Sequence, residues 1–540
     1  MNDRNRSTTL DTPPKIVLIG VVFLCFCGLF VVQGSLNSQR SELSPTYLEP
    51  LQDAPPLLAL TTQSLGGFRG IISSYLWLRA NNMQLQKKYQ EQMQLSEWVA
   101  QLQPHVSMVW RNRAWNMAYN ISVTYRDKET RWKYVTEGVS LLRDKGIRYN
   151  PQEPLIYHEL AWIFQHKIGH NMDDHHRYYK LRWLQEMTDV LWENEAQANT
   201  MRGVPNLDEL IDPPNDEVAA RVKKLRELYK MDPREMKAVN EKYGRVEKGD
   251  GEVIYALDWR KPETQAIYWA MVGLKRCRHN PSKENDIRKL ERIVYQSMMY
   301  SFDRGKLNTP SGAIVPPDQY FNNPLLVVPN MDLTERTHQS YIDMAALAKK
   351  EREANVEGTY HIAHMNFLRR VVEWNYYYNR EDEALKWLKI ALETYPTKMM
   401  YFTGTKKDKE GNWVYDMDKF VLHRLKDAVN RGSIDKTLAI LIGLMIRHFT
   451  HLALGENEEA ASHLTMAENL HQRFTDRFSS AAENRVSLPS FEKVKLARLR
   501  AFLVEDDPIL VKRLRTVLGL KEGELPEEPQ VREAQPNPNQ

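Results

Sequence analysis

An uncharged apolar run near the N-terminus sets the first limit on how this 540-residue chain can fold. Residues 16–34 read IVLIGVVFLCFCGLFVVQG and contain no charged side chain. A helix of about 20 residues spans a hydrocarbon core of about 30 Å, whereas a helix buried in a water-soluble protein normally keeps a polar stripe. The sequence therefore predicts one transmembrane helix over 16–34, followed by a polar, helix-patterned body.

A cleaved secretory signal is the alternative interpretation of this run. Small or β-branched residues, Val32 and Gly34, precede Ser35 where a signal peptidase would cut. The length of the run favours an uncleaved anchor, because signal cores usually have about 7–15 residues. Both interpretations carry the body across a membrane.

The orientation of the anchor follows from the charges on either side of it. Arg4, Arg6 and Lys15 precede the run, and only Arg40 lies within a similar distance after it. The flank richer in Lys and Arg stays cytoplasmic. We therefore expect a single-pass protein of the bacterial inner membrane, with residues 1–15 cytoplasmic and the body periplasmic.

Charge and cysteine content exclude several classes of function. The chain has 74 Lys+Arg and 70 Asp+Glu, a formal net charge of +4, and no long basic run, so nucleic-acid binding has no support. Cys25 and Cys27 lie in the apolar run, which leaves Cys277 alone in the body, without a partner for an intramolecular disulfide. No CxxC, GxSxG, Walker or dinucleotide-binding motif occurs. We expect no cofactor and no catalytic activity.

The remainder of the chain reads as amphipathic helices separated by short breaks containing Pro, Gly or Asn. We expect a linker at 35–64, an N-terminal helical-repeat region at 65–302, a long connection at 303–332, a C-terminal helical-repeat region at 333–520 and a disordered tail at 521–540. The predicted helices are 65–81, 84–102, 107–124, 128–148, 153–168, 173–195, 216–230, 233–243, 262–278, 284–302, 333–353, 357–378, 381–395, 415–429, 434–454, 457–478, 489–503 and 507–519. The KGDG sequence at 248–251 predicts a turn.

A short pattern recurs at the start of several helices: a proline, an aromatic six residues later, then residues that can pack one turn further on. Proline ends the preceding helix, and small residues let a neighbouring helix approach closely. The copies begin at Pro104 (Trp110, Ala114), Pro151 (Tyr157, Leu160, Ala161, Phe164) and Pro262 (Tyr268, with Gly273 following). A second helix pattern consists of Ala384, Leu388, Ala391 and Pro396, and again of Ala460, Leu464 and Ala467.

These residues resemble the tetratricopeptide repeat, a helix–turn–helix of about 34 residues. Tyr157, Leu160, Ala161 and Phe164 match its first helix, and residues 381–396 match its second. The layout also resembles membrane-anchored bacterial repeat proteins with no assigned activity. The resemblance implies an all-α fold, a tetratricopeptide-like α-solenoid of helical hairpins with one N-terminal transmembrane helix. A closed α/α-toroid, as in carbohydrate enzymes, is the competing architecture.

The densest polar cluster lies between His158 and His176. His166 and His170 are spaced to share a helix face, and Asp174 could add an oxygen, so these three are the candidate metal ligands. No established metal motif is present. We expect instead a solvated turn between two helices, with Asp173 or Asn171 as the N-cap.

The apolar segment 65–78 contains one charged residue, Arg69. We expect it to cap the helical array by packing on the next hairpin, with attachment to the bilayer surface or to partner transmembrane helices as alternatives. Together these features predict a membrane-anchored scaffold for protein–protein interaction in the bacterial envelope. The alternative is a carbohydrate-binding or carbohydrate-active toroid acting on extracytoplasmic polysaccharide.

Overall fold

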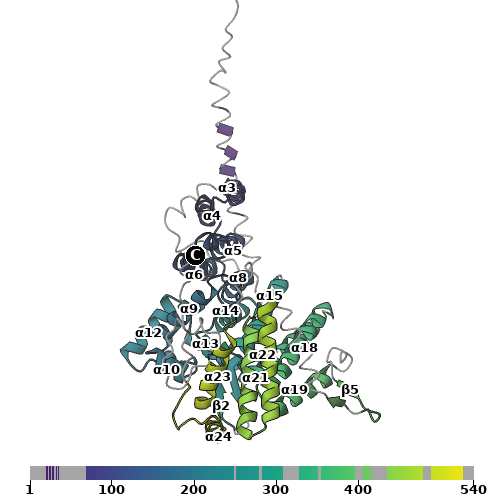
Figure 1. Cartoon of the computed structure of the whole chain (residues 1–540). Coiled ribbons are helices and arrows are strands. Elements are labelled where there is room, and N and C mark those ends of the chain that lie inside the picture. The colour runs from purple at the N-terminus through teal and green to yellow at the C-terminus, as the bar shows by residue number, and fades with distance from the viewer. Residues whose placement is uncertain are drawn as a thin grey trace, which may run out of the picture. The chain divides into compact units, whose positions relative to one another are not determined.

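The computed structural model describes residues 68–247, 251–278, 283–307, 327–350, 354–395, 405–411, 413–415, 434–477 and 488–526, with scattered positions between 17 and 35. These residues are predominantly α-helical, which confirms the all-α prediction at the level of fold class (Figure 1). The chain divides into two compact units, residues 1–116 (unit 1) and 117–540 (unit 2).

From residue 68 onward, unit 1 contains three helices. They are α3 (Phe68–Leu85), α4 (Tyr89–Leu102) and α5 (Ser107–Trp115). Helix α3 packs along α4, and α4 packs on α5. The side chains of Ser73 and Ala80, which lie on one face of α3, are buried. The opposite face of α3 is exposed to solvent.

The first part of unit 2 is built from short helices. They are η1 (Asn116–Ile121), η2 (Ser122–Thr124), α6 (Lys128–Ser140), η3 (Leu141–Gly146), α7 (Ile147–Tyr149), α8 (Pro154–Trp162), η4 (Ile163–Ile168), α9 (His176–Leu191), α10 (Glu195–Thr200), α11 (Leu207–Ile211), α12 (Asp216–Glu227), α13 (Pro233–Val239) and η5 (Asn240–Gly244). Five of them, α6, α8, α10, α12 and α13, begin with a side chain that accepts a hydrogen bond from a backbone N–H of the first turn. In α12 the Asn215 side chain accepts from the Val218 N–H, while Asp216 and Glu217 lie in the first turn, where the helix dipole favours negative charge.

Four α-helices continue directly into π-helical turns. The turns η1, η3, η4 and η5 extend α5, α6, α8 and α13. The sequence predicts a single continuous helix over each of these stretches. The structure differs from that prediction only in the hydrogen-bond pattern, which changes from α to π. A π turn inserts an extra residue in the helical repeat and so rotates the following side chains relative to an α-helix.

Helix α14 (Pro262–Cys277) forms the centre of the middle part of unit 2, where it contacts α8, η4, α13 and α15 (Glu284–Arg304). Most of its residues are buried all round the helix, from Pro262 to Cys277. At Gly273 an added Cβ would lie 2.6 Å from the Tyr157 Cβ. A glycine here therefore permits the close approach of α14 to α8.

The C-terminal part of unit 2 consists of longer helices. They are η8 (Met331–Leu333), α17 (Thr334–Lys350), α18 (Ala354–Tyr377), α19 (Glu381–Thr394), α21 (Ile434–Leu454), α22 (Asn457–Arg477), α23 (Phe491–Glu505) and α24 (Pro508–Leu518). Helix α17 packs on α18, and α18 packs on α19. Helix α21 packs on α22, α23 and α24 (Figure 1). The apolar side chains of α18, α19 and α21 form one continuous core.

Three short antiparallel hairpins, which the sequence does not predict, interrupt the described helices. They are β1 (Arg245–Glu247) with β2 (Val253–Tyr255), β3 (Lys306–Leu307) with β4 (Val327–Val328), and β5 (Thr405–Lys407) with β6 (Trp413–Tyr415). The first hairpin encloses the predicted turn at 248–251. The second joins the two ends of the predicted connection at 303–332. The prediction of a helix beginning at Tyr415 is wrong at that residue, which ends β6; residues 416–429 lie outside the described residues.

The predicted membrane anchor lies largely outside the described residues. The few described positions in 16–34 are helical, and the side chains of Val17, Val21, Leu24 and Val32 are exposed. Among the described helices, one is long and apolar enough to cross a membrane: Lys436–Leu454 of α21, with 78% of that window buried inside the protein. The predicted segments 1–15 and 35–64, and the predicted tail beyond residue 526, also lie outside the described residues.

Candidate functional site

A row of stacked rings runs along one face of α8 and η4 and ends at His170, two residues after η4. The ring centroids are 6.2 Å apart between His158 and Trp162, 4.6 Å between Trp162 and His166, and 5.9 Å between His166 and His170. Side chains four residues apart meet on one helix face. The two predicted histidines therefore lie together, stacked on each other.

The third candidate metal ligand does not join them. Asp174 is exposed in the turn before α9. Within the described ranges, no group of three or more His, Cys, Asp or Glu side chains is arranged to hold a metal ion. The Nδ1 atom of His166 lies 3.2 Å from the Tyr119 hydroxyl, and burial together with the neighbouring Lys167 lowers the pKa of His166. Here the imidazole takes part in a packed, hydrogen-bonded row.

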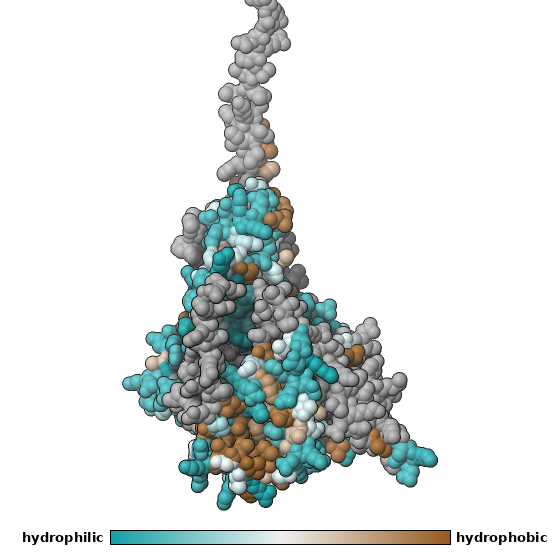
Figure 2. All heavy atoms as spheres, viewed as in Figure 1, coloured by the Kyte–Doolittle hydropathy of each residue, from teal (hydrophilic) through white to brown (hydrophobic). Residues whose placement is uncertain are grey.

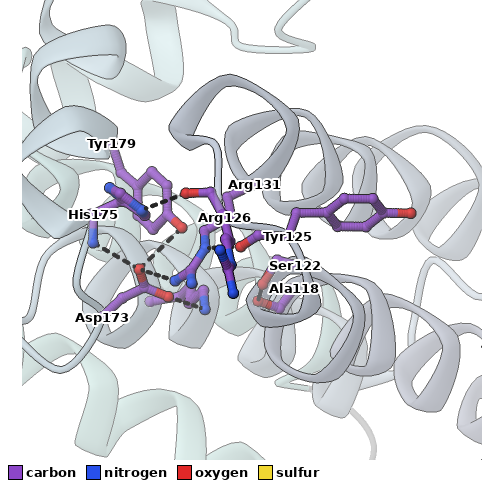
Figure 3. Close-up of polar contacts among 9 residues, drawn as sticks. Ala118, Ser122, Tyr125, Arg126, Arg131, Asp173, His175 and Tyr179 are labelled. Carbon is purple, nitrogen blue, oxygen red and sulfur yellow. Dashed lines mark hydrogen bonds and ion pairs between the residues drawn. The ribbon is translucent and has the colours of Figure 1, made fainter. Parts of the chain in front are cut away.

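The adjacent acid, Asp173, is the centre of a buried ion network (Figure 3). Its Oδ2 atom accepts from the Lys167 ammonium at 2.6 Å, and its Oδ1 atom accepts from the Arg131 guanidinium at 3.3 Å. The Tyr179 hydroxyl at 3.1 Å and the His175 backbone N–H at 2.9 Å also donate to Oδ1. A carboxylate offers about four acceptor positions, so Asp173 is saturated.

The expectation of a solvated turn is therefore wrong for Asp173, which is only 8% exposed. The residue does accept from a backbone N–H at the start of α9, as an N-cap would, but its other partners come from α6, η4 and α9. Burial alone would raise the pKa of this carboxyl. The Lys167 ammonium and the other donors outweigh burial and hold that pKa below its usual range.

The network carries more positive than negative charge. Burial lowers the pKa of Lys167, while Asp173 opposes that shift. The Lys167 ammonium also lies 5.3 Å from the centre of the Tyr119 ring and 5.9 Å from that of Tyr179, distances at which aromatic faces attract a cation. These contacts hold η1, α6, η4 and α9 against one another around a single acid.

A second polar group lies next to this network. The Lys180 ammonium donates to the Asn171 side chain at 2.7 Å and lies 2.8 Å from Nδ1 of His176. Burial first, and then the neighbouring cations, lower the pKa of His176 to about 2. The imidazole is thus a neutral acceptor. Nearby, Arg304 donates to the buried Glu263 carboxylate at 2.9 Å.

The proline–aromatic pattern has a hydrogen bond as its structural basis in two of its three copies. The indole N–H of Trp110 donates to the Pro104 carbonyl at 2.7 Å, and the Tyr157 hydroxyl donates to the Pro151 carbonyl at 2.8 Å. Each bond satisfies a carbonyl in the loop before the helix. In the third copy the hydroxyl of Tyr268 instead accepts from the Asp232 N–H at 2.9 Å.

The residues expected to pack between repeats lie mainly in the interior. Twelve of them are at most 3% exposed: Ala460, which is 1% exposed, and Trp110, Ala114, Tyr157, Leu160, Ala161, Phe164, Tyr268, Ala384, Leu388, Ala391 and Ala467. Leu464 is partly buried against the C-terminal core. Pro396 lies outside the described residues.

Unit 1 contains an apolar pocket of about 380 Å³ between its three helices. Its lining comprises Ser73, Ser74, Trp77, Leu78, Val99, Gln103, Val106, Met108 and Val109. The side chains of Leu78, Val106 and Met108 are also exposed to solvent. Figure 2 shows hydrophobic atoms on one flank of unit 1. No carboxylate, histidine or cysteine belongs to this lining.

The sequence reasoning missed the partners of Asp173, although one signal was present. Lys167 follows Ile163 by four residues and Phe164 by three, so it lies on the buried stripe of its helix. A lysine at such a position requires a buried acid. Arg131, 42 residues before Asp173, gives no comparable local signal.

No protein-family model matches the chain, and no curated protein matches it in sequence.

Proposed function

We propose that the chain is a membrane-anchored helical scaffold that binds another protein in the bacterial envelope. The observation that carries this proposal is the serial packing of helices in unit 2, in which α14 contacts α15, α17 contacts α18, α18 contacts α19 and α21 contacts α22. Stacked helical hairpins of the tetratricopeptide type present long surfaces whose side chains can vary without disturbing the stack. Such an array suits recognition of a protein partner.

The state of the buried charges supports a non-catalytic role. The ion pairs with a buried acid join Asp173 to Lys167 and Arg131, Asp258 to Arg260, Glu263 to Arg304, and Glu373 to Lys436. Each acid is used to hold helices or loops together. A general base or nucleophile needs a group that can reach a substrate.

The anchor and its orientation belong to the same proposal. Residues 16–34 cross the bacterial inner membrane once, with 1–15 cytoplasmic and the body periplasmic, as the charge flanks favour. Helix α21 does not compete for this role, because its apolar window is mostly covered by the rest of unit 2. One crossing then leaves the chain from residue 35 onward in the periplasm.

Affinity capture of the full chain from membranes dissolved in mild detergent tests the scaffold. We expect one protein to co-purify at a constant ratio to the chain. Two surface variants that introduce a negative charge locate the contact: Ile362→Asp on α18 and Ile509→Asp on α24, whose side chains are 50% and 65% exposed. Loss of the partner in one variant, with retention in the other, identifies the binding face.

The capture also tests the carbohydrate alternative. Recovery of polysaccharide without a stoichiometric protein would overturn the scaffold proposal. The pocket of unit 1 contains Trp77, but its lining has no carboxylate. A glycosidase needs two carboxyl groups across a cleft, so that pocket does not favour this alternative.

A further inference from the structure

Helix α3 exposes a strip of large apolar side chains, which we define as Ile71, Tyr75 and Leu78. Their exposed fractions are 67%, 62% and 69%. Spacings of four and three residues place them on one face of the helix. The buried residues Ser73 and Ala80 lie on the opposite face, where α3 packs on α4. The strip is therefore not needed for the packing within unit 1.

The strip continues into the pocket of unit 1. Leu78 belongs to both, and Val106 and Met108 extend the apolar surface on the far side of the pocket, with 41% and 57% of their side chains exposed. An exposed apolar surface of this kind marks a binding site. In Figure 2 hydrophobic atoms gather beside α3.

The charged residues of α3 and of the turn that follows it are all positive. Helix α3 contains no acidic residue, and Arg79, Lys87 and Lys88 are exposed at its end and in the turn that follows. The first acidic residue after the strip is Glu91. The segment 65–78 alone, with one arginine, carries little charge, but the whole helix and its turn carry several cations. Basic side chains next to an apolar helix face are attracted to anionic lipid headgroups.

We propose that the strip Ile71, Tyr75 and Leu78 lies on the surface of the bilayer, with Arg79, Lys87 and Lys88 at the anionic headgroups. This inference rests on the proposed membrane anchor, because an anchor over 16–34 holds α3 near the bilayer at a high effective concentration. The intervening residues 35–67 can extend by roughly 3.3–3.6 Å each, so the chain reaches back without strain. A second copy of unit 1 fits less well, since its cations would face those of the first.

Photocrosslinking of the full chain tests which molecule covers the strip. The probe p-benzoyl-phenylalanine replaces Tyr75, and the chain is placed in nanodiscs of phosphatidylcholine with a minority of phosphatidylglycerol. We expect lipid adducts at position 75, and fewer in pure phosphatidylcholine. The same probe in place of Ile509, which is equally exposed in unit 2, serves as the matched control and gives no lipid adduct.

The double variant Ile71→Glu with Leu78→Glu carries the same probe at Tyr75. Its yield of lipid adduct should be at least about tenfold lower than that of the chain that keeps Ile71 and Leu78. Adducts to a second copy or to another protein at position 75, or none at all, would overturn the inference. Extraction of the membranes with carbonate reports separately on the anchor. A chain that resists extraction yet gives no lipid adduct at Tyr75 keeps the anchor and loses the surface contact. A chain that is extracted yet gives the adduct loses the anchor and keeps the surface contact.

Discussion

At the scale of single residues, Asp173 shows how one side chain can hold several elements together. Replacing Asp173 by Asn leaves the Lys167 and Arg131 cations buried without an anionic partner. Breaking a buried ion pair in this way costs about 3–5 kcal/mol. We expect Asp173→Asn to lower the free energy of unfolding of unit 2 by that amount, measured by denaturant titration with tryptophan fluorescence.

The neighbouring acid provides the matched control for this variant. Asp174 is exposed, so Asp174→Asn should change the free energy of unfolding by less than about 1 kcal/mol. Equal effects of the two variants would contradict the structural role of the network. In the wild type, the Asp173 carboxylate stabilises the fold above its unfolded-state pKa of about 4. That contribution is lost as the pH falls through the lower folded-state pKa.

A second residue-scale prediction concerns His364 of α18. Its Nε2 lies 2.8 Å from Nδ1 of His338, and its Nδ1 lies 2.8 Å from the Tyr395 hydroxyl. Burial, with the neighbouring His338 and His361, lowers its pKa to about 3. Between that value and the unfolded pKa of about 6.5, only the unfolded chain binds the proton, so stability falls as the pH falls.

The variant His364→Gln removes this titrating group and keeps a side chain that can hydrogen-bond to His338. From pH 6 to pH 4 the wild type should lose about 1 kcal/mol per pH unit more stability than the variant does. Denaturant midpoints measured across this interval give both slopes. Parallel slopes would show that His364 is protonated in the folded chain.

At the scale of elements, helical glycines set the distance between neighbouring helices. An added Cβ at Gly443 of α21 would lie 2.6 Å from the Tyr377 carbonyl oxygen and 2.7 Å from its Cβ. Because the obstacle includes backbone, Gly443→Ala should cost about 1–3 kcal/mol, more than the roughly 1 kcal/mol that alanine gains in helix propensity. Thermal unfolding followed by circular dichroism measures the loss.

A glycine in open space gives the opposite expectation. Nothing lies within 4 Å of a Cβ added at Gly358 of α18, so Gly358→Ala should raise stability by about 0.5–1 kcal/mol. Opposite signs for the two variants support close packing of α21 on α18. A stabilising Gly443→Ala would contradict it.

The same elements show what the sequence could and could not predict. Helices α21 and α22 lie within one residue of their predicted bounds, because their apolar periodicity is long and their breaks contain glycine. The π turn η4 escaped prediction because a local change from α to π bonding leaves the apolar pattern nearly unchanged. The sequence did not predict the burial of Asp173 either, because that burial depends on Arg131 from another helix. Local sequence patterns predict the helices. The burial and ionisation of a charged side chain depend instead on its partners in the tertiary structure.

At the scale of the whole molecule, two segments are long and apolar enough to cross a membrane: residues 16–34 and the window Lys436–Leu454 of α21. The run 16–34 has exposed apolar side chains at its described positions, whereas the window Lys436–Leu454 is 78% buried within unit 2. A helix that already buries its apolar surface in protein gains little from lipid. We therefore propose that residues 16–34 make the crossing, while α21 belongs to the core.

The double variant Val21→Arg with Leu24→Arg tests this assignment. Each arginine near the middle of a spanning helix costs about 2.5–3.5 kcal/mol of insertion free energy, so together they should prevent insertion. We expect the wild type to remain in the membrane pellet after carbonate extraction and the variant to move to the soluble fraction. The control Val123→Arg with Leu228→Arg, at exposed positions of unit 2, should stay in the pellet.

A variant that remains embedded would point to a second crossing, and a soluble wild type beginning at Ser35 would identify a cleaved signal. Because the two arginines leave every described contact of unit 2 intact, loss of the membrane with retained helical folding would show that the anchor and the core are separate parts of one chain.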